Sequence, residues 1–111
     1  MNNDWQVQLE LEFARAAQAR AKDNEGQARV CARRAAGIIV REYLTRRGES
    51  ITNPSAYELL QKLADDPTLT AGLHQSVIYL TMRVNEEFKL PANIDLVDEA
   101  RKLYVGLLEK K

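Results

Sequence analysis

Residues 27–47 read QARVCARRAAGIIVREYLTRR, and this stretch decides the fold. It is long enough for about six helical turns at roughly 3.6 residues per turn. Its middle, residues 35–40 (AAGIIV), is apolar on every side of a helix, and its arginines gather toward the two ends. A helix that is apolar all round needs neighbours on more than one face. The stretch therefore predicts the central helix of a small helical domain.

Length and composition fit one helical domain over residues 1–111. A chain of 111 residues can bury a core without help from a metal or a disulfide. Apolar residues make up 45% and charged residues 29%, which excludes a disordered or linker-rich protein. Sixteen basic and sixteen acidic side chains cancel, so the chain lacks the basicity of a general nucleic-acid binder.

The chain has the features of a cytoplasmic protein. No apolar run approaches the roughly 20 residues that a membrane span needs. The first residues, MNNDW, lack the basic and apolar regions of a secretory signal. The single cysteine, Cys31, excludes an internal disulfide framework and suits a reducing compartment.

Four further helices are expected around the central one, which gives an all-α, five-helix, mostly antiparallel bundle. Their expected ranges are 4–22, 54–64, 68–88 and 96–109. Capping residues mark their ends. These are Asn24 in a capping box with Gln27, Gly48 in a left-handed conformation, Asn53 before Pro54, and Asp95.

The inner faces of these helices follow from apolar spacing. The short third helix is expected to bury Tyr57, Leu60 and Leu63, and the fourth carries a stripe of Leu73, Val77, Leu80, Val84 and Phe88. The last helix should turn inward Leu96, Ala100, Leu103, Tyr104 and Leu107.

The first helix admits a second interpretation. Val7, Leu9, Leu11 and Phe13 alternate with polar residues, as in a strand. The alanine-rich continuation over 14–21 contains no turn signal and favours a helix. Its buried side would then carry Trp5, Leu9, Phe13 and Ala16.

The residue inventory excludes most kinds of catalytic centre. One cysteine and one histidine cannot assemble a metal site, and scattered glycines form no phosphate-binding loop. Cys31 is expected in the core, and His74 at the edge of the apolar stripe of the fourth helix. We expect no bound cofactor and no metal.

Arg33, Arg34 and Arg41 are the candidate anion-binding residues. Arg34 and Arg41 are seven positions apart and so lie on nearly one line of the central helix. They either cover apolar edges and pair with acids such as Glu42, Glu10 or Glu12, or bind phosphate or a nucleic-acid backbone. For an anion site we expect them exposed at one end of the helix and unpaired by acids. Few aromatic residues are present to stack bases, which weighs against RNA binding.

Surplus apolar surface predicts a symmetric homodimer. The central helix has apolar residues opposite its main stripe, and the fourth helix has others beside its own. The expected contact residues are Val30, Gly37, Val40, Leu44, Ile78 and Met82. Val7 and Leu11 add apolar surface on the first helix.

The order of these segments resembles HEPN domains (higher eukaryotes and prokaryotes nucleotide-binding). The resemblance lies in residues 28–44 (ARVCARRAAGIIVREYL), in residues 57–60 (YELL) and in residues 97–103 (VDEARKL). It implies a helical bundle that dimerises and is often encoded with a nucleotidyltransferase partner. In many members it also implies a metal-independent ribonuclease.

The ribonuclease members carry an arginine followed, after four to six residues, by a histidine, and this chain departs from that pattern. Its only histidine is His74, and Pro67, Thr68 and Leu69 stand where the arginine would fall. Arg83 has no histidine after it. Without the imidazole, no general acid or base with a pKa near neutrality is evident.

Two functions are therefore favoured, and a degenerate ribonuclease without the motif histidine is the third alternative. The first is a non-catalytic HEPN-like interaction or regulatory module, homodimeric and cytoplasmic. The second is a nucleotide- or RNA-binding protein that uses the three arginines and partners a nucleotidyltransferase.

Overall fold

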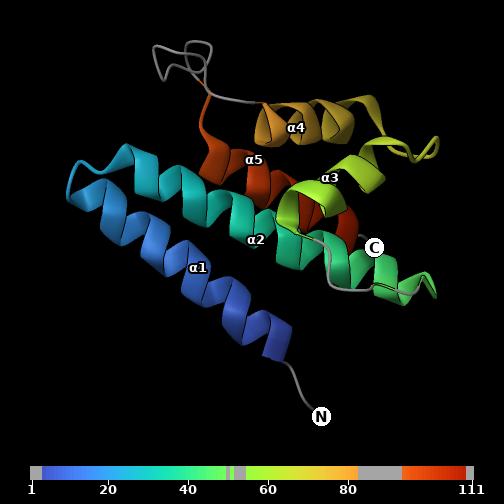
Figure 1. Cartoon of the computed structure of the whole chain (residues 1–111), viewed down its shortest axis with the longest axis horizontal. Coiled ribbons are helices and arrows are strands. Elements are labelled where there is room, and N and C mark those ends of the chain that lie inside the picture. The colour runs from blue at the N-terminus through green and yellow to red at the C-terminus, as the bar shows by residue number, and fades with distance from the viewer. Residues whose placement is uncertain (1–3, 50, 52–54, 83–93, 110–111) are drawn as a thin grey trace.

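The computed structural model describes residues 4–49, 51, 55–82 and 94–109 (Figure 1). Within these ranges the chain is helical and contains no strand. The helices are α1 (Asp4–Ala21), α2 (Glu25–Arg46), α3 (Ala56–Ala64), α4 (Ala71–Thr81) and α5 (Leu96–Leu103), and a π-helical turn, η1 (Tyr104–Leu108), continues α5. The predicted all-α fold of five helices is confirmed, and the strand interpretation of the first segment is wrong.

The α2 helix is the centre of the fold. It contacts each of the other helices, and Figure 1 shows α1 along one side of it and α5 along another. Ala35, Ala36, Ile39 and Val40 have no exposed surface, because neighbours cover more than one face of this apolar stretch. None of the helices in the described ranges is long and apolar enough to cross a bilayer.

The two ends of α2 follow the capping prediction with one exception. The backbone N–H of Gln27 donates to Asn24 Oδ1 at 3.1 Å, as expected. In a capping box the Asn24 N–H would also donate to the Gln27 side chain. Here the Asn24 N–H donates instead to the Ala19 carbonyl at 2.8 Å, and the Gln27 side chain donates to Cys31. At the other end Gly48 has φ +82°, the predicted left-handed conformation.

The α3 helix begins later than expected. Ser55 is its cap, and Ser55 Oγ accepts from the Glu58 N–H at 3.2 Å. The expected cap at Asn53 and Pro54 lies outside the described residues. Leu60 and Leu63 are buried as predicted, but Tyr57 is 45% exposed and Leu59 is buried instead. The prediction for Tyr57 was wrong because, in a helix this short, one or two residues decide which side is buried.

The α4 helix is shorter than the predicted 68–88. Thr70 caps it at one end, where Thr70 Oγ1 accepts from the Leu73 N–H at 3.3 Å. It ends at Thr81, and Met82 has an extended backbone. Val77 and Leu80 are buried as the stripe predicts, whereas Val84 and Phe88 lie outside the described residues.

The α5 helix begins as predicted. Asp95 Oδ1 accepts from the N–H groups of Val97 and Asp98 at 3.0 and 3.2 Å. The expected helix to Glu109 changes from α to π geometry at Tyr104. A Cβ at Gly106 would lie 2.7 Å from Leu73 Cδ2, so this turn approaches α4 as closely as glycine permits.

Candidate functional site

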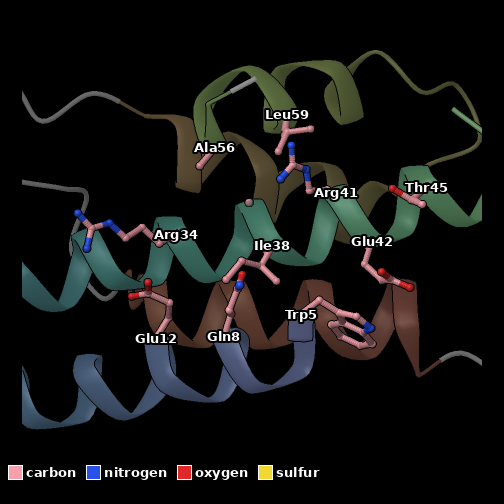
Figure 2. A pocket seen from close by; sticks show the side chains of 11 residues that line it. Trp5, Gln8, Glu12, Arg34, Ile38, Arg41, Glu42, Thr45, Ala56 and Leu59 are labelled. Atoms are coloured by element: carbon pink, nitrogen blue, oxygen red, sulfur yellow. The ribbon is translucent and has the colours of Figure 1, made fainter. Parts of the chain in front are cut away.

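A groove of about 380 Å³ lies along α2 between α1 and α3 (Figure 2). Its lining residues come from the three helices. They are Trp5, Gln8 and Glu12 from α1, then Arg34, Gly37, Ile38, Arg41, Glu42 and Thr45 from α2, and Ala56 and Leu59 from α3.

Helical spacing explains why these residues share one groove. Residues three and four apart lie on the same side of a helix. Positions 34, 38, 41 and 45 of α2 and positions 5, 8 and 12 of α1 follow that spacing. Gly37 sets the depth of the floor, since a Cβ there would lie 2.7 Å from Ala56 Cβ. The absence of a side chain at Gly37 thus lets α3 approach α2.

Arg34 and Arg41 are exposed, and neither forms an ion pair within the described part of the chain. They lie about 10 Å apart along the helix axis, at roughly 1.5 Å per residue. Glu42 lines the same groove but is engaged by Arg46, whose Nε donates to Glu42 Oε2 at 2.8 Å. Pairing of Arg34 and Arg41 with acids, which the sequence left open, is thus absent among the described residues. Their expected place together at one end of the helix is wrong, because the apolar residues 35–40 separate them.

Arg33 does not belong to the groove, which corrects the predicted three-arginine site. It is half-buried, and it donates from Nε to the Leu80 carbonyl at 3.0 Å and from a terminal nitrogen to the Met82 carbonyl at 3.2 Å. Burial, and then the positive charge of Arg29, lower the pKa of Arg33 from its usual value. One position along a helix turns a side chain by about 100°, so Arg33 and Arg34 face different neighbours.

Glu12 is the acid of the α1 wall, toward one end of the groove (Figure 2). Its side chain is 13% exposed, and its Oε1 atom is buried without a hydrogen-bond partner among the described residues. The other oxygen, Oε2, lies 3.7 Å from a terminal nitrogen of Arg15. Figure 2 shows this carboxylate directed from α1 toward α2, beneath Arg34.

Trp5 closes the opposite end of the groove. It is half-buried, and the guanidinium carbon of Arg46 lies 5.5 Å from the centroid of its ring. This is within the range of a cation–π contact. The sequence placed Trp5 on the buried side of α1 and did not identify it, Gln8 or Glu12 as groove residues. Their spacing of three and four beside Leu9 is the signal that could have identified them.

The predicted dimer contact is only partly available as surface. Gly37, Val40 and Leu44 are buried against other helices of the same chain, so they present little surface to a second copy. The reason is that other helices of the same chain cover the side of α2 that we expected to face a second copy. Val30 and Ile78 are 38% and 37% exposed.

The remaining candidate residues lie apart from the groove. Cys31 is fully buried, as predicted, and His74 is exposed on α4, which does not line the groove. In the described ranges no three His, Cys, Asp or Glu side chains gather as metal ligands. The residues that meet in the groove are therefore two arginines, one acid without a full set of partners, and an apolar floor.

No family model matches this chain. No curated protein and no solved structure matches it either. The resemblance to HEPN domains accordingly rests on the order and character of the helices alone.

Proposed function

We propose that this chain is a non-catalytic binding module, and that the groove between α1 and α3 binds a phosphate-bearing ligand of nucleotide size. The observation that carries this proposal is the pair Arg34 and Arg41, exposed and without ion pairs in the described part of the chain, above an apolar floor. Arginine is suited to phosphate because its planar guanidinium can donate two parallel hydrogen bonds.

The local charges support an anionic ligand. Of the two acids that line the groove, Glu42 is already bound to Arg46. Outside the groove, Arg33 donates to the Leu80 carbonyl of α4. Arg34 and Arg41 form no ion pair with a described residue, and Glu12 is the one groove acid that is not engaged by a close ion pair, so the two arginines leave a net positive potential in the groove. Over the apolar floor of the groove this potential is screened less than on an open surface.

The size of the groove favours a single nucleotide over a long strand. About 380 Å³ is within the range of small-molecule sites, roughly 300–1,000 Å³. A track for single-stranded RNA normally offers several free aromatic faces for stacking. Here Trp5 is the only aromatic residue of the lining, and Arg46 lies over its ring.

Acid–base catalysis in the groove would need a group with a pKa near neutrality. His74, the only histidine of the sequence, stands on α4 and is not among the groove residues. The groove offers carboxylates and guanidinium groups, whose ordinary pKa values lie far from neutrality. These groups suit binding and orientation of a ligand better than proton transfer at neutral pH.

Trp5 provides the test, because it is the only tryptophan of the chain and lines the groove. Titration with nucleoside monophosphates, and separately with a short RNA, should change its fluorescence in a saturable way. Binding should weaken as salt rises. The double variant Arg34→Ala/Arg41→Ala should lose at least about tenfold in affinity, since each charge-assisted bond contributes roughly 1.5–3 kcal/mol.

A matched control removes the same charge elsewhere. Lys22 and Lys62 are exposed and lie outside the groove. The variant Lys22→Ala/Lys62→Ala should bind as the wild type does. If nucleotide and RNA both leave the Trp5 signal unchanged at millimolar concentration, the proposed ligand class is wrong.

We also propose that the chain associates with itself in the cytoplasm. Val7 and Leu11 are 65% and 46% exposed and lie one turn apart on α1. Exposed apolar side chains one turn apart on a helix suit contact with a partner. Sedimentation velocity over a range of concentrations tests this, and a strict monomer at the highest concentration would exclude it.

The HEPN resemblance further leads us to propose a nucleotidyltransferase as a binding partner. Co-expression with a nucleotidyltransferase encoded beside this chain, followed by co-purification, tests that partner.

A further inference from the structure

The carboxylate of Glu12 has an unmet hydrogen-bonding requirement. Its Oε1 atom is buried and has no partner among the described residues. A buried acceptor without a donor costs free energy, and native proteins leave few of them. The nearest positive group, on Arg15, reaches only the other oxygen, at 3.7 Å. Because this atom has almost no exposed surface, a donor from outside the chain meets the carboxylate only when the Glu12 side chain turns toward the groove.

Glu12 is placed to meet a ligand held by the arginines. It lines the same groove as Arg34 and Arg41, and in Figure 2 its carboxylate lies between α1 and α2, beneath Arg34. The terminal torsion of a glutamate is broad and two-fold. A half-turn about this torsion exchanges its two oxygens, so either of them can take the position that faces the groove.

We infer that Glu12 accepts a hydrogen bond from an amino group of the bound ligand, so that the groove selects nucleotides whose base carries an exocyclic amino group. This inference rests on the proposed function and extends it from the phosphate to the base. Carboxylates accept from the N4 amino group of cytosine. Uracil presents a carbonyl oxygen at that position, and two facing acceptors repel each other.

The selectivity follows from the arrangement of charge. Arg34 and Arg41 bind the anionic part of the ligand whatever the base is. Glu12 then distinguishes one base from another, because a site built to receive a donor rejects the analogue that lacks it. Affinity and base preference should therefore depend on different side chains.

Two pairs of nucleotides test the amino group. GMP and IMP differ only in the amino group at position 2 of the purine and so isolate it. CMP and UMP differ at the exocyclic group and also at N3, which accepts in cytosine and donates in uracil. Titration of the wild-type chain, followed by Trp5 fluorescence and by NMR, should give roughly tenfold tighter binding of CMP than of UMP. GMP should exceed IMP in the same direction.

The variant Glu12→Gln is nearly isosteric and tests the assignment directly. It should reduce the CMP-to-UMP ratio to less than about twofold, because the amide can donate to the uracil carbonyl as well as accept. The control is Glu10→Gln, since Glu10 is exposed on α1 outside the groove and should leave the ratio unchanged. Circular dichroism of both variants establishes that each is folded.

The outcomes separate this inference from the function on which it rests. If all four nucleotides bind equally and still depend on Arg34 and Arg41, the groove binds phosphate and the role of Glu12 is wrong. The same holds if Glu12→Gln keeps the wild-type ratio, as it would if Arg34 turned onto Glu12 in solution. If none of the nucleotides binds, the proposed function itself fails.

Discussion

Arg33 on α2 donates a hydrogen bond from Nε to the carbonyl oxygen of Leu80, near the end of α4, at 3.0 Å. A terminal nitrogen of the same side chain donates to the Met82 carbonyl at 3.2 Å. The last carbonyl groups of a helix have no partner within the helix. A side chain from the central helix therefore satisfies the end of a helix far away in the sequence.

Replacing Arg33 should destabilise the fold. The variant Arg33→Ala leaves two carbonyl groups without this donor and should lower the free energy of unfolding by about 2 kcal/mol. Arg33→Lys should recover only part of the loss, because an ammonium lacks the fork of the guanidinium. Urea unfolding followed by circular dichroism measures the change.

Arg34→Ala is the control for this prediction, because it removes a neighbouring arginine that makes no ion pair in the described part of the chain. Its effect should stay within about 0.5 kcal/mol. Equal losses in Arg33→Ala and Arg34→Ala would contradict the role assigned to Arg33.

Gly37 is a second position where a small change should have a large effect. A Cβ there would lie 2.7 Å from Ala56 Cβ and 3.0 Å from Ala56 Cα. Gly37→Ala should therefore destabilise the chain by about 1–3 kcal/mol through overpacking, despite the better helix propensity of alanine. Thermal unfolding provides the measurement.

Two further variants separate packing from propensity. Gly72 lies near the start of α4, and a Cβ added there would meet nothing within 4 Å. Gly72→Ala should therefore raise stability by up to about 1 kcal/mol. The double variant Gly37→Ala/Ala56→Gly should recover part of the loss at Gly37. A stabilising Gly37→Ala would show that α3 does not pack so closely on α2.

The fold was largely predictable because it rests on local signals. The apolar middle of residues 27–47 predicted a covered central helix, and the caps at Asn24 and Asp95 and the left-handed Gly48 were read correctly. These features depend on a few neighbouring residues. The end of α4 was not predictable, because the group that satisfies its carbonyls is Arg33, which lies on another helix.

The groove was only half predictable for the same reason. The spacing of Arg34 and Arg41 placed them on one line of α2, but which arginines are paired depends on side chains from other helices. The sequence could not tell that Arg33 turns to α4 while Arg46 occupies Glu42. It also could not show that Glu12 from α1 meets the same groove, since this depends on how the two helices are rotated against each other.

A buried polar contact joins α4 to α5. Ser76 is 1% exposed, and its hydroxyl donates to Glu99 Oε1 at 2.7 Å, while Lys102 Nζ lies 3.2 Å from Glu99 Oε2. Ser76→Ala removes the donor and leaves a carboxylate oxygen buried without it. The expected loss is about 1–3 kcal/mol in urea unfolding.

A double-mutant cycle identifies the cause of that loss. When both partners become apolar, no buried acceptor is left without a donor. Ser76→Ala/Glu99→Met should therefore cost less than the sum of the two single variants. Strict additivity of the three measurements would mean that Ser76 and Glu99 do not interact.

Asp66 should give the chain a specific dependence on acid pH. Its Oδ1 accepts from the Thr68 hydroxyl at 2.7 Å and from the Thr68 N–H at 2.9 Å, and Arg47 pairs with its other oxygen. These contacts, the Thr68 hydroxyl first, lower the pKa of Asp66 from 3.8 to about 2. Because the folded pKa lies below the ordinary one, the ionised carboxylate stabilises the fold above pH 3.8, and this contribution disappears as the pH falls toward 2.

Comparison with Asp66→Asn isolates this contribution, because asparagine keeps an oxygen for Thr68 but loses the charge. At neutral pH the variant should be less stable by about 1 kcal/mol, a value limited by the exposure of Arg47 to solvent. The difference should shrink as the pH falls from about 4 to about 2, because the wild-type carboxylate then becomes protonated. Urea unfolding at a series of pH values measures this difference.

Asp65→Asn, one residue away and exposed, is the control and should show no such narrowing of the stability difference. If the wild type and Asp66→Asn instead lose stability in parallel over this range, the interactions assigned to the Asp66 carboxylate are absent in solution.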